Sequence, residues 1–458
     1  MNRRDFFRLV PLTIPGLLVG DRALGAQMSF TFGADRFSGE PLALVYPRRI
    51  REMLTRVRET QSENILEAAY AIAHAVEKGN RVWCYWDQGH THTADIFPGR
   101  NGEPEILTPG YDPKQAKKGD IVLVDYPMNP ELIADIAAKD LFVVGGPSPW
   151  SGDMLYGIEW VTSQAMRIQV RPVADIWIET YIDAIGAQVK VPGSSAPLGP
   201  ESGPLSTSIL WMMLADACRI LSLDGKPVNV KGDEPKLGEK TNWVSLSAPL
   251  MDDYFDEIIR ELEMVPTELG SIRKMAGIAV DTLLCGGKVY FYSRYPEALA
   301  SEATGRRGGF AFARNLSDGK ISGTSKDCVI MGTYKPDDEA DLKNLDALKS
   351  LGMRTLSIGP VTRDLKIPER KIIARETEAH AGRMTDTYGL FAIPGFERRV
   401  CPTSGVMVTT ILWTLSAEIA DQIITRTGDV PAIYFNGALT WDARWDEQMR
   451  ALMNTRGY

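Results

Sequence analysis

Apolar and polar positions follow two patterns along this chain: long stretches with apolar residues three or four positions apart, and short runs that are apolar throughout. Between residues 51 and 78 the apolar side chains recur at helical spacing and the stretch ends at Gly79, which predicts an amphipathic helix. Further helices are predicted at 130–138 and 206–221, and buried strands at 82–86, 121–124, 141–144 and 174–180. Apolar strands that alternate with helices predict a parallel sheet covered by helices on both faces.

The second half of the chain repeats this order. A helical pattern before Gly286 is followed by predicted strands at 289–292, 329–331 and 355–358, and by a closing helix at 411–424. The stretch 226–250 between the halves is polar, rich in Lys, Gly and Pro, and lacks periodicity. Such a composition is typical of a linker or a surface excursion.

The halves also share short segments in the same order. The segments 82–85, 120–122 and 180–181 have similar counterparts 207 residues later, and 202–211 has one 202 residues later. A solenoid unit is about 20–50 residues long, so a repeat of this length predicts a duplicated domain. We therefore predict an α/β fold with two duplicated three-layer domains at 51–225 and 251–440, each a parallel sheet flanked by helices, with a linker at 226–250 and a tail at 441–458.

The amino terminus has the features of an export signal. Arg3 and Arg4 precede an apolar run at 9–20 and small residues up to Ala26, as in a twin-arginine signal peptide. The alternative is a cytoplasmic basic terminus followed by a buried segment. The run is shorter than the about 20 residues that span a bilayer, so we expect a signal peptide at 1–26, a periplasmic or secreted protein, and no stable membrane insertion.

The charge and the cysteine content argue against a nucleic-acid partner and a zinc site. The net charge of −8 becomes −10 without residues 1–26, which hold four arginines and two aspartates. An acidic chain argues against a nucleic-acid partner, whereas a helix N-terminus can still hold a small anion. The five cysteines show no CxxC spacing, so Cys84 and Cys328 are expected to be buried thiols and no zinc site is expected. We expect no cofactor and no metal.

Two of the four histidines, His90 and His92, lie close together, with Asp87 just before them. Alternate residues of an extended loop share a face. The second copy has Glu297 and Leu299 at the matching positions, so histidine chemistry belongs to the first copy alone. The pair fits acid–base work on a carbon next to a carbonyl, a divalent-metal site completed by a carboxylate, or capping of the following helix.

Other candidates flank the predicted strands and the closing helix. Glu179 ends the fourth strand, and its counterpart is Asp386; a solvent-facing strand end is the alternative. Ser206 and Thr207 open a helix, where hydroxyls cap the backbone or help its amides to hold an oxyanion. Tyr126 offers a ring that stacks on a sugar.

These features resemble the SIS (sugar isomerase) domain family. The match is closest to its phosphosugar-binding-like members, which carry a Gly-His-Ser-His loop after the first strand. Here the loop is Gly89-His90-Thr91-His92, and the helix start Gly203-Pro204-Leu205-Ser206-Thr207 is similar to the family's Gly-Pro-x-Ser-Thr. The resemblance implies a sugar site at the carboxyl ends of the strands. The expected substrate-binding residues are Asp87, Gly89, Thr91, Tyr126, Ser206 and Thr207.

The chain departs from this family after the second strand. Phosphosugar domains place a hydroxyl-rich Ser-x-Ser-Gly-x-Thr loop there to hold phosphate. The corresponding segments here, 125–130 and 332–336, contain prolines, which lack a backbone N–H. A neutral sugar or glycoside is therefore the expected ligand.

Together, the residues and the resemblance predict an exported sugar isomerase or epimerase that works through an enediol. His90 or Glu179 would be the base and His92 the acid. The alternatives are a non-catalytic carbohydrate-binding module and a metal-dependent lyase or hydrolase that acts on an oxidised sugar. The partner is a small-molecule sugar or sugar derivative, and the two copies suit either an intrachain pseudo-dimer or a homodimer.

Overall fold

The computed structural model places the larger part of the chain. The described residues are 40–86, 102–125, 130–146, 173–182, 187–194, 196–232, 236–294, 299–304, 308–316, 321–361, 371–382, 389–434 and 444–458. Pro41–Tyr458 is one compact unit, separate from Met1–Glu40. The predicted signal peptide at 1–26 lies outside the described residues.

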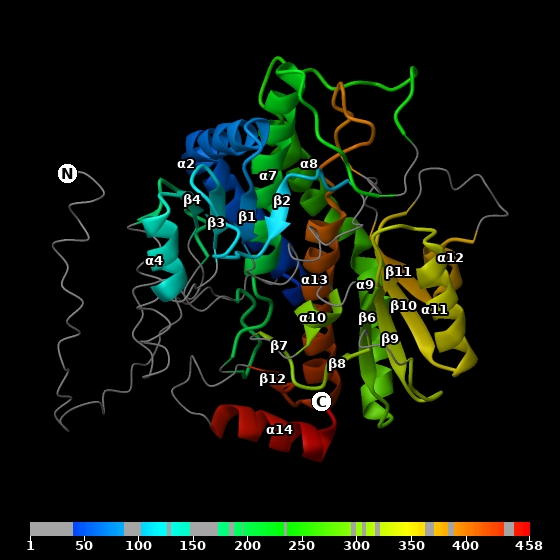
Figure 1. Cartoon of the computed structure of the whole chain (residues 1–458). Helices are drawn as coiled ribbons and strands as arrows, with labels where there is room; N and C mark the ends of the chain where they lie inside the picture. The colour runs from blue at the N-terminus through cyan, green and yellow to red at the C-terminus, as the bar shows by residue number, and fades with distance from the viewer. Residues whose placement is uncertain are drawn as a thin grey trace, which may run out of the picture. The chain divides into compact units, whose positions relative to one another are not determined.

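The first copy contains a parallel five-stranded sheet (Figure 1). Its strands lie in the order β2-β1-β3-β4-β5, and every neighbouring pair is parallel. The elements are α2 (Leu42–Glu77), β1 (Val82–Tyr85), β2 (Leu107–Pro109), β3 (Ile121–Val124), α4 (Pro130–Ala138), β4 (Phe142–Gly145), β5 (Ile176–Trp177) and α7 (Ser202–Leu223).

The second copy has an equivalent sheet, with the order β11-β10-β9-β6-β8. Its elements are α8 (Leu250–Met264), η1 (Val265–Glu268), α9 (Leu269–Leu284), β6 (Val289–Ser293), α10 (Leu299–Ala303), β7 (Gly309–Phe310), β8 (Arg314–Asn315), β9 (Cys328–Gly332), α11 (Glu339–Ser350), β10 (Arg354–Ile358), α12 (Ile373–Glu376), β11 (Ala379–Ala381), α13 (Ser404–Thr427), β12 (Ile433–Tyr434) and α14 (Arg444–Arg456). Taken from the opposite edge, this order repeats that of the first sheet. The predicted α/β fold with two duplicated parallel sheets is confirmed.

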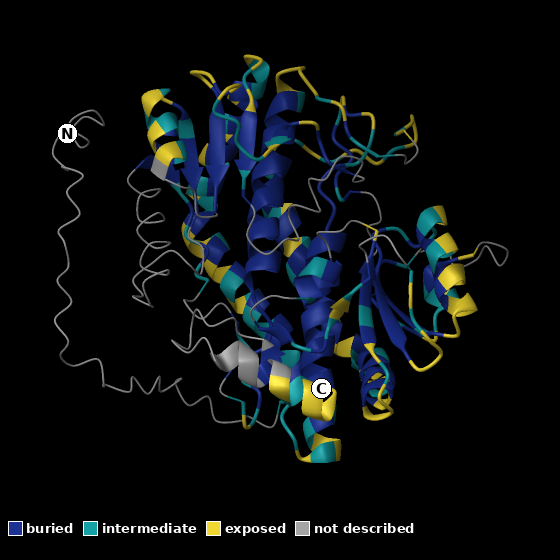
Figure 2. Ribbon diagram, turned by 60° about the horizontal axis from the view of Figure 1, so that its bottom comes forward, coloured by how far each residue is buried: buried dark blue, intermediate teal, exposed yellow. Residues whose placement is uncertain are grey.

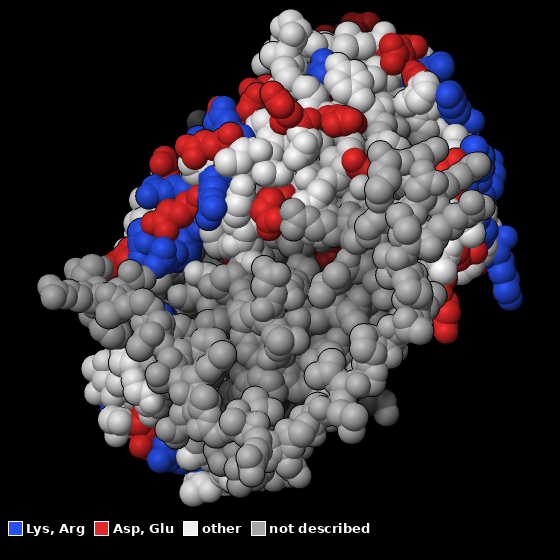
Figure 3. All heavy atoms as spheres, turned by 90° about the vertical axis from the view of Figure 1, so that its left-hand side faces the viewer, with Lys and Arg blue, Asp and Glu red and all other residues white. Residues whose placement is uncertain are grey.

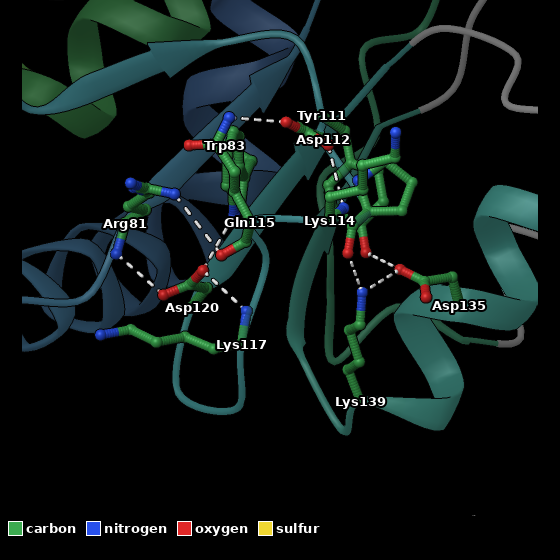
Figure 4. A network of polar contacts seen from close by, with 11 residues as sticks. Arg81, Trp83, Tyr111, Asp112, Lys114, Gln115, Lys117, Asp120, Asp135 and Lys139 are labelled. Carbon is green, nitrogen blue, oxygen red and sulfur yellow. Dashed lines mark hydrogen bonds and ion pairs between the residues drawn. The ribbon is translucent and has the colours of Figure 1, made fainter.

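The duplication extends to individual hydrogen bonds. Asp120, just before β3, accepts the backbone N–H groups of Arg81 at 3.0 Å and Lys117 at 3.1 Å (Figure 4). Asp327, just before β9, accepts the backbone N–H groups of Lys288 and Thr324, both at 2.8 Å. These donors lie 207 residues after Arg81 and Lys117. Asp120 thus joins the turn before β1 to the turn before β3, and Asp327 joins the turn before β6 to the turn before β9. This shared function explains why an aspartate occurs at both positions.

The first helix differs between the copies. The first copy has one helix of 36 residues, α2, whereas the second copy uses α8, η1 and α9 over the corresponding length. Pro266 lies in η1, and proline removes a helical hydrogen bond and clashes with the preceding turn. The interruption between α8 and α9 is therefore explained by this proline, which α2 lacks at the corresponding point.

The closing helices α7 and α13 form the centre of the protein. They pack on each other, and both pack on α2 (Figure 1). Figure 2 shows these central helices buried, with exposed residues concentrated on the peripheral helices and loops. Among the described helices, α7 is long and apolar enough to cross a membrane, and 94% of its apolar window is buried within the protein. Packing between the two copies therefore accounts for its apolar composition.

Reciprocal backbone contacts join the two copies. The N–H of Cys401, just before α13, donates to the carbonyl of Gly102 in the first copy at 3.1 Å. The N–H of Gly199, just before α7, donates to the carbonyl of Gly308 in the second copy at 3.0 Å. The donors Gly199 and Cys401 are equivalent at the 202-residue offset, and the acceptors Gly102 and Gly308 lie within one residue of equivalence. Such near-reciprocal contacts are characteristic of a two-fold interface, and here both partners belong to one chain.

The described residues of the stretch after α7 form backbone hydrogen bonds with both copies. Pro104 and Val230 form an antiparallel bridge, and in the second copy β12 pairs antiparallel with β7 in the same way. Further along, the N–H of Val244 donates to the carbonyl of Ala392 at 3.0 Å. The predicted linker 226–250 therefore packs on both copies, and the predicted domain limits stay predictions.

Some element limits differ from those expected. The first helix begins at Leu42 rather than near residue 51, because Tyr46 and Ile50 are fully buried and extend its apolar face. The fourth strand shortens to Ile176–Trp177. The predicted tail contains α14.

Candidate functional site

The strand order indicates where each copy would bind a ligand. In a 2-1-3-4-5 sheet the connections leave the first strand towards opposite edges, and ligands bind outside the carboxyl ends of the strands at that switch point. In the first copy this point lies beyond β1 and β3. It lies beyond β6 and β9 in the second copy.

Trp86 links the carboxyl end of β1 to the closing helix. Its side chain is fully buried, and its indole N–H donates to the carbonyl of Ser206 in α7 at 3.0 Å. The ring also lies against the turn after β4, since a Cβ at Gly146 would be 2.8 Å from it. Trp86 therefore brings β1, β4 and the first turns of α7 together at the switch point.

Ser206 and Thr207 are two of the predicted substrate-binding residues. Both are fully buried, and neither hydroxyl has a hydrogen-bond partner among the described residues. The next hydroxyl, on Ser208, donates to the carbonyl of Pro204 at 2.7 Å. Buried polar groups in proteins are nearly always hydrogen-bonded, to protein, water or ligand. Two adjacent buried hydroxyls without a partner among the described residues therefore suit a hydroxylated ligand.

Glu179, a predicted catalytic residue, lies beside β5 and α2. Its N–H donates to Oε1 of Gln61 at 3.0 Å, and its carboxylate accepts the indole N–H of Trp177 at 3.4 Å. The side chain is half-buried. Glu179 is therefore hydrogen-bonded to α2, whereas Trp86 is hydrogen-bonded to α7.

The remaining predicted site residues lie outside the described residues. They are Asp87, Gly89, His90, Thr91, His92 and Tyr126. Asp386, the counterpart of Glu179 in the second copy, also lies outside them.

Two buried carboxylates at this end of the first sheet were not among the predicted site residues. Asp125 directly follows β3 and is 1% exposed. Glu201 directly precedes α7, is fully buried, and accepts Nε2 of Gln188 at 3.1 Å. The signal for Asp125 is an acidic residue immediately after an apolar strand. Glu201 borders the duplicated segment, where the second copy has Thr403.

The second copy carries charged groups at its own switch point. Arg294, just after β6, pairs with Asp338 at 2.7 Å, and Asp338 also accepts two N–H groups at the start of α11. Nearby Asp341 is 4% exposed. Burial, followed by the charge of Asp338, raises the pKa of Asp341 to about 7, and burial raises that of Tyr292 to about 12. Asp341 therefore changes its charge near neutral pH.

His380 lies within the second sheet. Its Nδ1 is 2.8 Å from Oγ of Ser357, which is also 2.8 Å from Oγ1 of Thr377, and its Nε2 is 3.1 Å from the carbonyl of Gly382. Burial lowers the pKa of His380 to about 4. The ring is therefore neutral at physiological pH, a state that suits a structural hydrogen-bond network.

A second polar network lies near the amino ends of the first sheet (Figure 4). The hydroxyl of Tyr111 bonds to Asp135 of α4, which also accepts Nζ of Lys139 at 2.9 Å. Burial and the Asp135 hydrogen bond raise the pKa of Tyr111 far above its ordinary range. Because this end lies opposite the switch point, we assign the network a structural role that holds the segment before β3 against α4.

Surface charge and metal-ligand geometry add two observations. Figure 3 shows Lys and Arg interleaved with Asp and Glu over the described part of one face. Ion pairs such as that between Arg58 and Asp252 at 3.2 Å occur among the described residues. Within the described ranges no group of three His, Cys, Asp or Glu side chains is placed to hold a metal ion.

Comparisons with known proteins found similarity only at the level of solved structures. Neither a scan against protein-family models nor a search of curated proteins found a match. The similar structures include the C-terminal domain of glucosamine-fructose-6-phosphate aminotransferase from Francisella tularensis, with 12% identity, 83% of this chain and 97% of that chain covered, and a TM-score of 0.41. Tagatose-6-phosphate ketose/aldose isomerase from Escherichia coli is 10% identical, with 85% of this chain and 93% of that chain covered and a TM-score of 0.39. A candidate phosphosugar isomerase from Clostridium difficile is 10% identical, with 89% of this chain and 97% of that chain covered and a TM-score of 0.44.

The order of strands and helices in both copies carries the assignment of the fold. The chain has two parallel five-stranded sheets with helices between their strands, the duplicated α/β arrangement that its sequence predicted. The Gly-His-Thr-His loop at 89–92 lies outside the described residues.

Proposed function

We propose that this protein binds a neutral sugar at the carboxyl end of its first sheet and isomerises or epimerises it. The observation that carries the proposal is the pair of buried hydroxyls of Ser206 and Thr207, which have no partner among the described residues. A sugar hydroxyl both donates and accepts hydrogen bonds, so it can satisfy such groups. Trp86 adds a buried aromatic side chain at the same end of the sheet.

A neutral ligand is favoured over a sugar phosphate. Asp125 is buried where β3 ends, at the position where phosphosugar domains carry a hydroxyl-rich loop. A carboxyl group has fewer hydrogen-bond donors for phosphate than such a loop, and in its ionised form it repels a phosphate dianion. The prolines in 125–130 reduce the number of backbone donors further.

The proposed chemistry uses His90 or Glu179 as base and His92 as acid. The base takes the proton from the carbon next to the carbonyl, and the acid delivers a proton to the carbonyl oxygen. The product is an enediol. Protonation of the neighbouring carbon, with loss of the hydroxyl proton from the first carbon to form the new carbonyl, completes an aldose–ketose interconversion. Imidazole suits both steps because its pKa lies near neutral pH.

Binding is tested by a thermal-shift screen. The probes are D-glucose, D-fructose and N-acetyl-D-glucosamine, with fructose 6-phosphate as the phosphorylated comparison. A ligand specific for the native state raises the unfolding temperature. We expect a neutral sugar to do so in the wild type, and Ser206→Ala to reduce the effect. Ser208→Ala is the matched control, since the Ser208 hydroxyl already has a backbone partner. A response to fructose 6-phosphate alone would contradict the neutral-ligand proposal.

Catalysis is tested on the sugar that binds. NMR in deuterated water reports exchange of the proton next to the carbonyl and the appearance of the isomer. His90→Ala should abolish both while the thermal shift remains. Binding without exchange in the wild type would instead identify a carbohydrate-binding module.

We also propose export through the twin-arginine route. The support is the pairing of Arg3 and Arg4 with the apolar run at 9–20. A fusion of residues 1–39 to a folded reporter should reach the periplasm, and replacement of both arginines by lysine should retain it in the cytoplasm. Export of the lysine variant would refute this route.

A further inference from the structure

The hydroxyls of Ser206 and Thr207 differ from most buried hydroxyls in helices. A serine or threonine inside a helix commonly donates to the carbonyl four residues earlier. Ser208 in α7 does so at 2.7 Å, and its counterpart in α13, Thr410, does so at 2.8 Å. Ser206 and Thr207 are equally buried, but neither hydroxyl makes such a bond. Contacts from outside the helix are therefore the ones to examine.

Trp86 supplies such a contact to the turn that carries both hydroxyls. Its indole N–H donates to the carbonyl of Ser206 at 3.0 Å, and its side chain is fully buried. On the side of β4 the ring meets Gly146, where even a Cβ would lie 2.8 Å from it. A rigid ring in a close-packed interior cannot move without displacing its neighbours. The ring of Trp86 therefore determines how far the start of α7 lies from the ends of the strands.

The second copy differs at both positions. The residues equivalent to Trp86 and Ser206, at offsets of 207 and 202 residues, are Ser293 and Val408. Both are buried. The hydroxyl of Ser293 accepts the N–H of Ala300 at 3.2 Å, and the side chain of Val408 needs no hydrogen-bond partner. The buried indole and the hydroxyl without a described partner thus occur together in the first copy and are both replaced in the second.

Another tryptophan shows what packing alone looks like. Trp413 in α13 is 1% exposed, and its indole N–H donates to Oε1 of Glu302 in α10, also at 3.0 Å. Trp86 and Trp413 therefore match in burial and in hydrogen-bond length. They differ in the acceptor, because only Trp86 bonds to the turn that carries Ser206 and Thr207. A comparison of the two separates a general effect on stability from a specific effect on the hydroxyls.

We propose that Trp86 is a positioning residue for the sugar site of the first copy, and that it acts through the carbonyl of Ser206 on the hydroxyls of Ser206 and Thr207. This inference rests on the part of the proposed function that places a sugar at these hydroxyls. Groups that bind one ligand must be held within about 0.5 Å of their productive positions. Because the two hydroxyls lie on consecutive residues, a shift of this turn changes both hydrogen bonds to the sugar at once.

The test compares Trp86→Phe with the matched control Trp413→Phe. Each change removes a buried indole and a hydrogen bond of 3.0 Å, so both should lower the unfolding temperature. Isothermal titration calorimetry gives the dissociation constants of D-fructose, D-glucose and N-acetyl-D-glucosamine. For the sugar that the wild type binds, we expect Trp86→Phe to weaken binding at least tenfold and Trp413→Phe to change it less than twofold. If Trp86→Phe does not fold, Gly146→Ala replaces it, since the added Cβ displaces the ring and keeps the indole.

A crystal structure of the Trp86 variant, or of its Gly146→Ala replacement, separates this inference from the proposed function. We expect the start of α7 to shift or the hydroxyls of Ser206 and Thr207 to turn towards carbonyls of their own helix. Hydroxyls that keep their wild-type positions overturn the positioning role, as does sugar binding that is unchanged or that Trp413→Phe weakens equally. A wild type that binds none of the probes refutes the proposed function, and the crystal structure then still decides whether Trp86 positions the two hydroxyls.

Discussion

Acidification should weaken the native state through His380. The neutral ring fits its surroundings: Nδ1 accepts the hydroxyl of Ser357, and Nε2–H donates to the carbonyl of Gly382. Protonation would place a proton on Nδ1, which then no longer accepts a hydrogen bond, and a charge on a half-buried ring. The pKa of about 4 in the folded protein reflects that penalty.

The size of the effect follows from proton linkage. Between its ordinary pKa of 6.5 and the folded value of about 4, the unfolded chain binds a proton at His380 that the native protein does not. Stability from this group is therefore fully present above pH 6.5 and is lost as the pH falls through this interval. The loss amounts to about 2 kcal/mol from about pH 7 to about pH 5, and to about 3 kcal/mol below the folded pKa.

The measurement compares the wild type with His380→Gln. Urea unfolding followed by tryptophan fluorescence gives the free energy of unfolding of both proteins at each pH. The variant should be less stable at neutral pH, because the network is incomplete, and the difference should shrink by about 2 kcal/mol at about pH 5. His74→Gln on α2 is the matched control, because that side chain is 64% exposed. A difference between wild type and His380→Gln that stays constant over this range refutes the reasoning.

Three further predictions concern stability. The pKa of Asp341 is raised to about 7, so the native state binds a proton that the unfolded carboxylate releases, and stability falls as the pH rises from 3.8 through about 7. Asp341→Asn should therefore raise the free energy of urea unfolding above neutral pH, by at most about 4 kcal/mol, and have little effect near pH 4; equal effects at both pH values would contradict this. Asp120→Ala and Asp327→Ala should each lower it by roughly 1–3 kcal/mol, because each leaves two part-buried backbone N–H groups without their acceptor, and a variant without loss would disprove the shared bracing role. Gly287→Ala should lower the thermal midpoint, since its Cβ would be 2.0 Å from the carbonyl oxygen of Lys326; an unchanged midpoint would show that the turn can relax.

The sequence predicted best those elements that have a clear start and stop signal or a fully apolar run. The helix at 130–138 was placed at its observed limits, since proline is favoured at a first helical position and the following Lys139-Asp140 turn ends the pattern. The apolar runs before Trp86 and Asp125 became β1 and β3. β2 was missed because its three residues include a proline, and α11 because few of its residues are buried.

The candidate site shows where local reasoning ends. Ser206 and Thr207 were identified from a helix-start motif, and the structure adds that they are buried without a described partner. Glu201 is buried and accepts a hydrogen bond from Gln188, 13 positions earlier, and no local pattern indicates either feature. The ion pair between Glu103 and Lys231 joins residues 128 positions apart. A polar stretch such as 226–250 therefore resembles a linker until its distant partners are known.

The reciprocal contacts between Cys401 and Gly102, and between Gly199 and Gly308, affect how this protein can change. In a homodimer every substitution at such an interface occurs twice, once in each subunit. Here the equivalent positions are encoded separately, so each can mutate alone while its opposite number keeps the old residue. Covalent fusion thus turns a symmetric assembly into one whose halves can specialise, and Trp86 bonded to Ser206, where the sibling half has Ser293 and Val408, is one such divergence.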